Sequence, residues 1–151
     1  MSAENLELIR SLQPGPEVDV ASVLADEILA AEWIGSVAHL FAPDVQGTMR
    51  FPGMSPVTYA GGIEGLADAW RDWLRSWSSY RFEVEDVLDG GDRIVVVKIG
   101  RGKQRPTAPE SSLRRAAIWT VTDGLITRVD FNIPYEEALS SIGLAAQHEL
   151  G

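Results

Sequence analysis

Residues 61–100 read GGIEGLADAWRDWLRSWSSYRFEVEDVLDGGDRIVVVKIG, and the spacing of the apolar residues changes within this stretch. In its first part the apolar residues fall on one face of a helix; they are Ile63, Leu66, Trp70, Trp73, Leu74 and Trp77. From residue 80 the apolar period is two, because Tyr80, Phe82 and Val84 alternate with charged residues. The stretch therefore predicts an amphipathic helix followed by a half-buried strand.

The strand pattern continues from here to residue 133. Residues 93–100 are apolar almost without interruption, which is typical of a central strand that is covered on both faces. Residues 111–122 and 125–133 predict two further strands, joined by Asp123-Gly124, a strong hairpin signal. Helices followed by hairpin-connected strands predict an α+β fold with an antiparallel meander, and they argue against a parallel βαβ array.

Upstream of residue 61 the sequence predicts helices and then a short irregular hairpin. Residues 6–12 predict a first helix, and Asp19 is positioned to cap a second helix whose apolar stripe covers residues 20–31. The helical pattern continues to Phe41, with Gly35 as a bend between two segments. The remaining predicted elements are extended runs at residues 46–51 and 56–60 and a short terminal helix at residues 134–139.

The length and composition predict one globular domain covering residues 1–151, with 45% hydrophobic and 23% charged residues. Thirteen Lys and Arg against 22 Asp and Glu give a net charge of −9, which argues against nucleic acid and anionic membranes as partners. No segment reaches the ~18 consecutive apolar residues of a membrane span. The start lacks the pattern of a signal peptide and the chain has no cysteine, so we expect a cytoplasmic protein.

The sequence contains no motif for a nucleotide cofactor or for a serine nucleophile. The patterns G-x-G-x-x-G, G-K-[ST] and G-x-S-x-G are all absent. The two histidines, His39 and His148, are far apart in the sequence, which excludes an H-E-x-x-H zinc helix. We therefore predict no cofactor and no metal site.

Several local strings resemble those of one known family. They are NLELIR at residues 5–10, FAPDV at 41–45, YAGGIEGL at 59–66, VLDGGDR at 87–93, IWTVTDGLI at 118–126 and VDF at 129–131. Over residues 4–144 the chain resembles the SnoaL-like branch of the nuclear transport factor 2-like superfamily, relatives of ketosteroid isomerases and polyketide cyclases. Residues 13–31 depart from the usual pattern and are predicted to be a helical insertion, and residues 145–151 a tail.

The resemblance implies a cone, in which a curved, mixed and mostly antiparallel sheet closes over about three helices and leaves a pocket inside. It also implies a homodimer. Ketosteroid isomerases place a carboxylate base near the hairpin after the second helix, whereas residues 47–51 contain no Asp or Glu. The isomerase mechanism is therefore poorly supported, and a shared fold does not by itself establish an activity.

Asp130 and His39 are the candidate catalytic residues. Asp130 lies on a strand whose far end borders the pocket in the resemblance, and a carboxylate against aromatic walls can act as a general acid or base. Strand alternation gives the alternative, because it places Asp130 on the face opposite Phe131. His39 can shuttle protons near neutral pH, or it can be a partly buried, hydrogen-bonded structural residue.

The candidate ligand-binding residues are aromatic or basic; they are Arg50, Tyr59, Trp70, Trp73, Trp119 and Phe131. The tryptophans can form flat walls for a ligand or fill the core between helix and sheet. Arg50 can hold an anionic group or be solvated at a strand edge. We predict a pocket that binds a small hydrophobic or aromatic molecule. The alternatives are an acid–base enzyme of the isomerase, polyketide cyclase or epoxide hydrolase type, and a dimerisation or interaction module.

Overall fold

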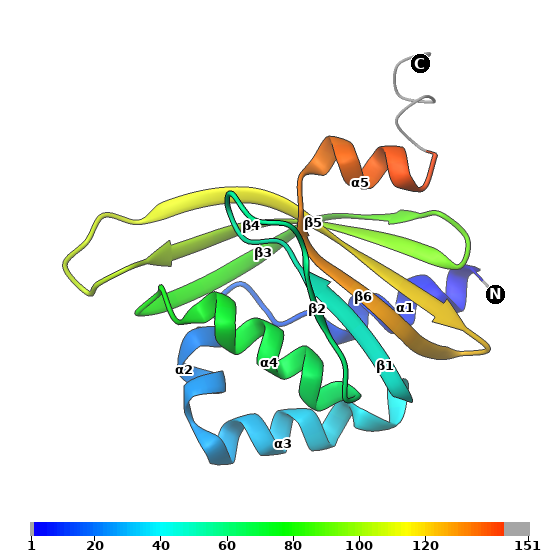
Figure 1. Cartoon of the computed structure of the whole chain (residues 1–151), viewed down its shortest axis with the longest axis horizontal. Coiled ribbons are helices and arrows are strands. Elements are labelled where there is room, and N and C mark those ends of the chain that lie inside the picture. Colours follow the sequence, from blue (N-terminus) through cyan, green and yellow to red (C-terminus); the bar gives the residue numbers. More distant parts are fainter. Residues whose placement is uncertain (1, 144–151) are drawn as a thin grey trace.

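The structure is a computed structural model that describes residues 2–143, and its centre is a strongly curved six-stranded sheet (Figure 1). The strands are β1 (Phe41–Met49), β2 (Val57–Tyr59), β3 (Ser79–Asp89), β4 (Arg93–Lys103), β5 (Ser111–Thr122) and β6 (Leu125–Ile133). Their order is β2-β1-β6-β5-β4-β3, and only the pair β1 and β6 is parallel among the described strands. The predicted α+β class, with a mixed and mostly antiparallel sheet, is confirmed.

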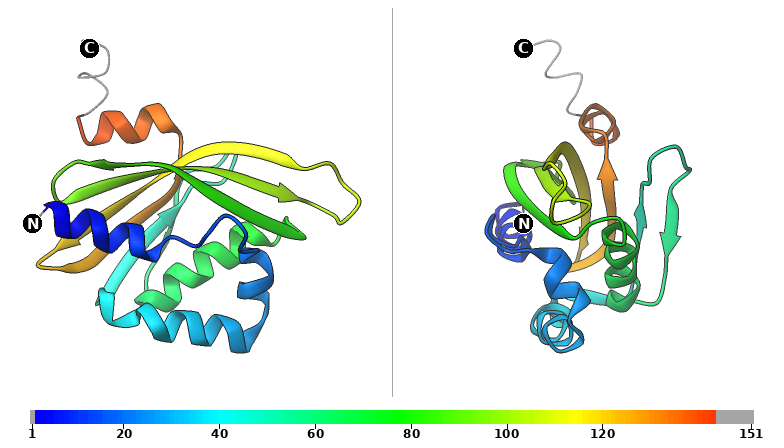
Figure 2. Two further views of the ribbon diagram at one scale, coloured as in Figure 1. Left: turned by 180° about the vertical axis from the view of Figure 1, so that it is seen from behind. Right: turned by 90° about the vertical axis from the view of Figure 1, so that its left-hand side faces the viewer.

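Helices lie on both sides of this sheet. They are α1 (Ser2–Leu12), α2 (Val20–Ala25), α3 (Glu27–Val37), α4 (Ile63–Leu74) and α5 (Tyr135–Ser141), and a 3-10 turn, η1 (Ala38–Leu40), precedes β1. Helices α1 to α4 lie on the concave side and α5 lies on the convex side (Figures 1 and 2). The main hydrophobic core therefore forms between α1, α2, α4 and the concave face, and a smaller cluster lies under α5.

Two predicted helix boundaries are wrong. The helix expected over residues 20–31 is broken at Asp26, which has an extended backbone and accepts two N–H groups of the next turn at 2.9 and 3.0 Å. Gly35, the predicted bend, lies within α3.

The helical pattern also stops before Phe41, which begins β1. Pro43 lies where the pairing of β1 with β6 shifts register. Proline is tolerated at such an irregularity because no ladder hydrogen bond needs its missing N–H.

The predictions for the two unusual segments have different outcomes. Residues 145–151, the predicted tail, lie outside the described residues, and so does His148. Residues 13–31 contain the turn after α1, all of α2 and the start of α3. Their status as an insertion stays a prediction.

Gly102 allows two aromatic rings to lie directly on β4. A Cβ atom at Gly102 would lie 2.5 Å from Trp77 Cε3 and 2.8 Å from Tyr80 Cδ2. We expect Gly102→Ala to lower the free energy of unfolding by about 1–2 kcal/mol, because overpacking forces the rings to move. The matched control is Gly35→Ala, since a Cβ there meets nothing within 4 Å, and it should stabilise α3 by about 0.5–1 kcal/mol. Urea unfolding measures both changes, and equal effects would contradict this account.

Candidate functional site

A cavity of about 110 Å³ lies between the helices and the concave face of the sheet. Its lining is contributed by the end of α1 and the turn after it, by α2, α3 and α4, and by all the strands except β2. The lining residues are Leu12, Gln13, Pro14, Val20, Leu24, Trp33, Ile34, Val37, Phe41, Ile63, Leu66, Ala67, Trp70, Phe82, Lys98, Trp119 and Phe131. An apolar protein cavity of ~150 Å³ holds a benzene molecule, so this smaller cavity has room for at most about one small ring.

Lys98 brings a titratable amine to this otherwise apolar cavity. Its side chain is 6% exposed, and it is the only charged residue that is buried among those described. The Nζ atom lies 4.2 Å from the ring centroid of Phe82 and 5.0 Å from that of Trp70. No hydrogen-bond or ion-pair partner of this amine is found within residues 2–143, and burial lowers the pKa of Lys98 to about 7.

The position of Lys98 follows from the alternation of β4. Ile94 and Val96 belong to the core on the concave side, whereas Val95 and Val97 belong to the cluster under α5. Lys98 continues the first set, so its side chain points to the concave side. Sequence reasoning missed this residue. The available signal was a lysine at the end of an apolar run in a strand that was expected to be covered on both faces.

Two further donors near Lys98 are buried without a partner. The indole Nε1 of Trp119 and the guanidinium Nε of Arg115 form no hydrogen bond in the described part of the chain. Trp119 lines the cavity, and Arg115 lies directly opposite Lys98 on β5. Arg115, Lys98 and Tyr80 line a recess of about 10 Å³, a separate small pocket that shares Lys98 with the cavity. All three unpartnered groups are donors, so the site is suited to a ligand atom that accepts hydrogen bonds.

Three of the predicted ligand-binding residues line the cavity: Trp70, Trp119 and Phe131. Trp70 is stacked on Phe82 at 5.7 Å between ring centroids, and Phe131 meets Trp70 edge-on at 5.4 Å. Trp73 is 7% exposed and lines the recess instead of the main cavity. The tryptophans of α4 therefore divide between the two roles weighed for them, cavity wall and core.

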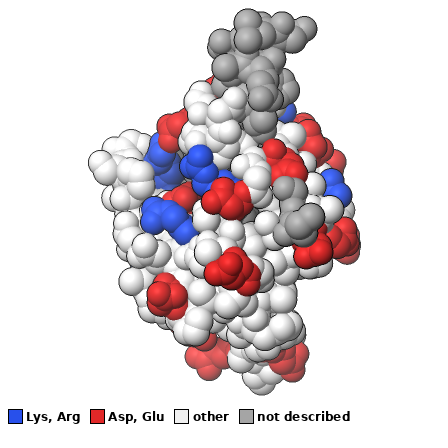
Figure 3. Space-filling view, turned by 90° about the vertical axis from the view of Figure 1, so that its right-hand side faces the viewer, with Lys and Arg blue, Asp and Glu red and all other residues white. Residues whose placement is uncertain are grey.

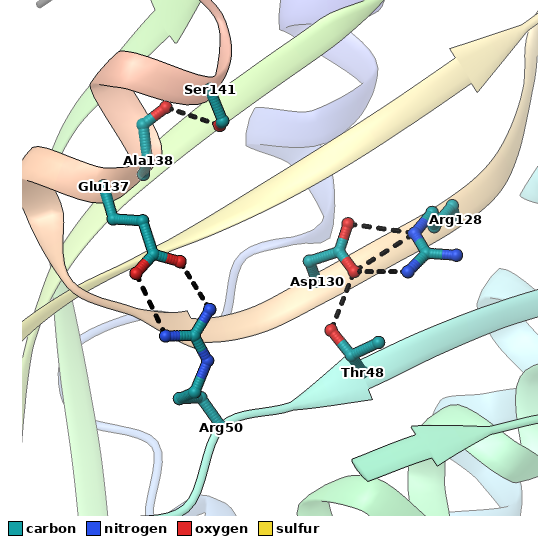
Figure 4. Close-up of polar contacts among 7 residues, drawn as sticks. All are labelled: Thr48, Arg50, Arg128, Asp130, Glu137, Ala138 and Ser141. Carbon is teal, nitrogen blue, oxygen red and sulfur yellow. Dashed lines mark hydrogen bonds and ion pairs between the residues drawn. The ribbon is translucent and has the colours of Figure 1, made fainter. Parts of the chain in front are cut away.

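Tyr59 and Arg50 lie elsewhere. The Tyr59 hydroxyl donates a hydrogen bond of 2.7 Å to Asp72 Oδ2, and burial together with this carboxylate raises the pKa of Tyr59 to about 12. Arg50 forms a bidentate ion pair with Glu137 of α5 (Figure 4). The pair leaves the Arg50 guanidinium at the opposite face of the sheet from the cavity, which it does not line.

The two predicted catalytic residues are also outside the cavity. Asp130 accepts a hydrogen bond of 2.7 Å from Thr48 Oγ1 and hydrogen bonds of 3.1 Å from Arg128 Nε (Figure 4). Its side chain lies on the face of β6 opposite Phe131, as the outward alternative had it. His39 is exposed in η1, and the structure shows no hydrogen bond for it. The structure does not bring these two residues together, and their catalytic role stays a prediction.

We expect Asp130→Asn and His39→Ala to leave the affinity of the cavity for a small apolar probe unchanged within about twofold, because neither side chain lines it. Asp130→Asn should cost about 1 kcal/mol of stability, since it weakens the hydrogen bonds with Thr48 and Arg128. Fluorescence titration with toluene measures the first effect and urea unfolding the second. A tenfold loss of affinity in either variant would contradict this placement.

The surface charges contrast with Lys98. On the face shown in Figure 3, basic side chains gather in the upper half beside acidic ones, and only acidic side chains are seen in the lower half. Each of the six ion pairs in the described part of the chain uses an arginine, and none uses a lysine.

No group of three or more His, Asp or Glu side chains within residues 2–143 could hold a metal ion. None of the described helices is long and apolar enough to cross a membrane.

Residues 13–129 match the family model of the SnoaL-like domain. This match covers more than half of the chain. The chain belongs to the SnoaL-like domain family. The resemblance seen in the local strings is thereby confirmed. A search of curated proteins found no match for this SnoaL-like domain.

Solved structures share the fold of this SnoaL-like domain at low sequence identity. A nuclear transport factor 2-like protein of unknown function from Burkholderia pseudomallei is 19% identical, with a TM-score of 0.61 over 92% of this chain and 97% of that one. A putative SnoaL-like polyketide cyclase from Jannaschia sp. CCS1 is 17% identical, with a TM-score of 0.63 over 95% and 94%. A phenazine biosynthesis-related protein from Pseudomonas aeruginosa is 18% identical, with a TM-score of 0.54 over 95% and 83%. These likenesses establish the nuclear transport factor 2-like fold.

Proposed function

We propose that this SnoaL-like domain binds a small hydrophobic or aromatic molecule in the cavity between its helices and its sheet. The observation that supports this proposal is the lining, which is apolar except for Gln13 and Lys98 and includes the aromatic faces of Trp70, Trp119 and Phe131. Pockets for small molecules have this character, with a few polar groups among many apolar ones. The volume of about 110 Å³ favours a ligand whose buried part is one ring.

The unpartnered donors add a requirement for the ligand. Trp119 Nε1 is buried without an acceptor, and the Lys98 amine lies in the same cavity. A buried donor without a partner costs about 1–3 kcal/mol, so a ligand that supplies an acceptor oxygen removes this cost. We therefore expect a ring that carries a carbonyl, phenolic or carboxylate oxygen to bind more tightly than a plain hydrocarbon of the same size.

Filling the cavity tests the proposal. Ala67 lies on α4, lines the cavity and is 8% exposed, so Ala67→Leu should place its added atoms in the space for the ligand. We expect toluene to raise the melting temperature of the wild type, and at least a tenfold loss of toluene affinity in the variant. Ala31→Leu is the matched control, because Ala31 is exposed on α3 and does not line the cavity. Equal toluene binding by both variants would exclude this cavity as the binding site.

A second candidate function, an acid–base enzyme, is favoured by one observation. Lys98 is a buried titratable group in a cavity, and its pKa, which burial lowers to about 7, lets it accept or give a proton near neutral pH. Asp130 and His39, which the sequence suggested for this role, do not line the cavity.

The homodimer implied by the family resemblance remains a prediction, and sedimentation velocity measures the oligomeric state directly.

A further inference from the structure

We propose that Lys98 is a nucleophile that forms an imine with an aldehyde or ketone group of the molecule bound in the cavity. This inference rests on the proposed function, because the rest of the carbonyl compound would occupy the apolar cavity. It adds the chemical class of the ligand and a covalent step.

Lys98 lines the cavity and is nevertheless buried. The residue is 6% exposed, yet it lines both the cavity and the recess, so it is within reach of a molecule in the cavity. The Nζ atom lies beside the stacked rings of Phe82 and Trp70, at 4.2 and 5.0 Å from their centroids. An amine fixed beside an apolar space is close to the carbonyl carbon of a bound ligand without competition from bulk water.

Within residues 2–143, no carboxylate lines the cavity or the recess around the amine. The titratable side chains that line the cavity and the recess are Lys98 itself, Tyr80 on β3 and Arg115 on β5. Burial raises the pKa of Tyr80, so its hydroxyl is neutral at physiological pH. The aromatic rings attract the ammonium form, whereas burial opposes it. With no carboxylate to hold the proton, a large fraction of the amine is neutral and nucleophilic near pH 7.

The residue type agrees with this role. Arginine cannot lose its proton in a protein, and a lysine can do so when it is buried. The whole chain has only two lysines, Lys98 and Lys103, and it uses arginine in every ion pair of the described residues. The one buried cation of the core is therefore the type that can become a free amine.

The covalent step is balanced without a further reactant. The lone pair of Lys98 Nζ attacks the carbonyl carbon, a carbon–nitrogen bond forms, and one of the two amine protons moves from nitrogen to the carbonyl oxygen to give a carbinolamine. The carbon–oxygen bond then breaks, and the hydroxyl group leaves with the second nitrogen proton as water while the carbon–nitrogen double bond forms.

Reductive trapping tests this inference on the full chain. The protein is incubated with benzaldehyde and sodium cyanoborohydride, which converts an imine into a stable benzyl amine, and the modified residue is located by peptide mass analysis. We expect Lys98 to be modified at least tenfold faster than Lys103, which serves as an internal reference. Lys98→Met should remove the fast adduct and Lys103→Arg should retain it. Toluene, which has the ring without the carbonyl, should slow the modification of Lys98 only.

The rate of the fast modification should rise about tenfold between pH 6 and pH 8, as the amine loses its proton. Equal labelling of the two lysines, or no adduct at Lys98, would overturn the inference. So would tighter binding of benzoate than of benzaldehyde without an adduct, because Lys98 would then be an anion partner. These outcomes leave the proposed function standing if toluene still binds. Failure of toluene and benzaldehyde alike to bind would instead overturn the proposed function.

Discussion

Lys98→Met is expected to raise the free energy of unfolding at pH 6 by about 2–4 kcal/mol. The wild-type protein must keep an ammonium group in a mostly apolar cavity at this pH, and none of the described residues that line the cavity or the recess is a carboxylate that could compensate it. Methionine has a similar length and no charge, so it fills the same space without the cost of desolvation. A substitution that stabilises the fold at a cavity wall would show that the lysine is kept for a reason other than stability.

The direction in which stability changes with pH follows from the lowered pKa of Lys98. Burial lowers the pKa of Lys98 from an ordinary value of 10.5 to about 7 in the folded state. Between these two pH values the unfolded chain binds one more proton than the folded chain, so the stability of the wild type rises with pH. The slope is about 1.4 kcal/mol per pH unit, which amounts to about 2–3 kcal/mol between pH 6 and pH 9.

Urea unfolding of the wild type and Lys98→Met at pH 6, 7.5 and 9 measures this effect. All other titrating groups are common to both proteins, so the difference between them isolates Lys98. We expect the advantage of Lys98→Met to be largest at pH 6 and to shrink as the pH rises. Lys103→Arg, at a partly exposed position on the same strand, should follow the wild type at every pH. A difference that does not change with pH would contradict the unpaired burial of the amine.

Asp19→Ala is expected to lower the free energy of unfolding by about 3 kcal/mol. Asp19 caps α2 by accepting hydrogen bonds from the N–H groups of Ala21 and Ser22, and its Oδ1 also accepts the N–H of Tyr80 at 3.0 Å. The loss of a helix cap costs about 1–2 kcal/mol. The Tyr80 N–H would in addition lose a charged acceptor in a partly buried place, which costs about 1–3 kcal/mol.

The charge of Asp19 gives this effect a pH dependence. Burial raises the pKa of Asp19, but the hydrogen bonds from Tyr80 and Ser22 outweigh it, and the net pKa is below the ordinary value. The carboxylate therefore contributes stability above the ordinary pKa of an aspartate, and this contribution is lost as the pH falls through the lowered value. The measurement is urea unfolding at pH 7 and pH 3. Asp19→Asn keeps an acceptor oxygen, so at pH 7 it should lose less than half of the stability that Asp19→Ala loses. Equal losses in both variants would contradict the capping role.

The strands from residue 79 onward and most of the helices could be predicted because their signals are local. The alternation from Tyr80 onward, the apolar run of β4 and the Asp123-Gly124 turn each depend on residues within one or two elements, and all three correspond to observed elements. The break at Asp26 was missed because the apolar stripe continues through it. The side chain of Asp26 ends one helix and caps the next by accepting backbone N–H groups, and the spacing of the apolar residues does not reveal such a hydrogen bond.

The candidate site was less predictable, because its residues come from segments that lie far apart in the chain. Trp70, Trp119 and Phe131 were selected as large aromatic residues, and the structure places them around one cavity. Asp130 was selected for its chemistry, but the parity of β6 directs it to a hydrogen bond with Thr48. Strand alternation had indicated that outcome, and only the side of the sheet that faces the helices was undecided.

By itself, the sequence determined the α+β class, the order of the elements, the Asp19 cap and the family, because these depend on periodicity, turn residues and local strings. The tertiary structure alone decided that Lys98 lies unpaired in the cavity, that Asp19 also binds the backbone of Tyr80, and which tryptophans form the cavity wall. The physical reason is that the burial of a side chain, and its hydrogen-bond or ion-pair partners, depend on which distant elements pack over it. A curved sheet brings together β3 to β6 and four helices, and no local pattern records the space that they enclose.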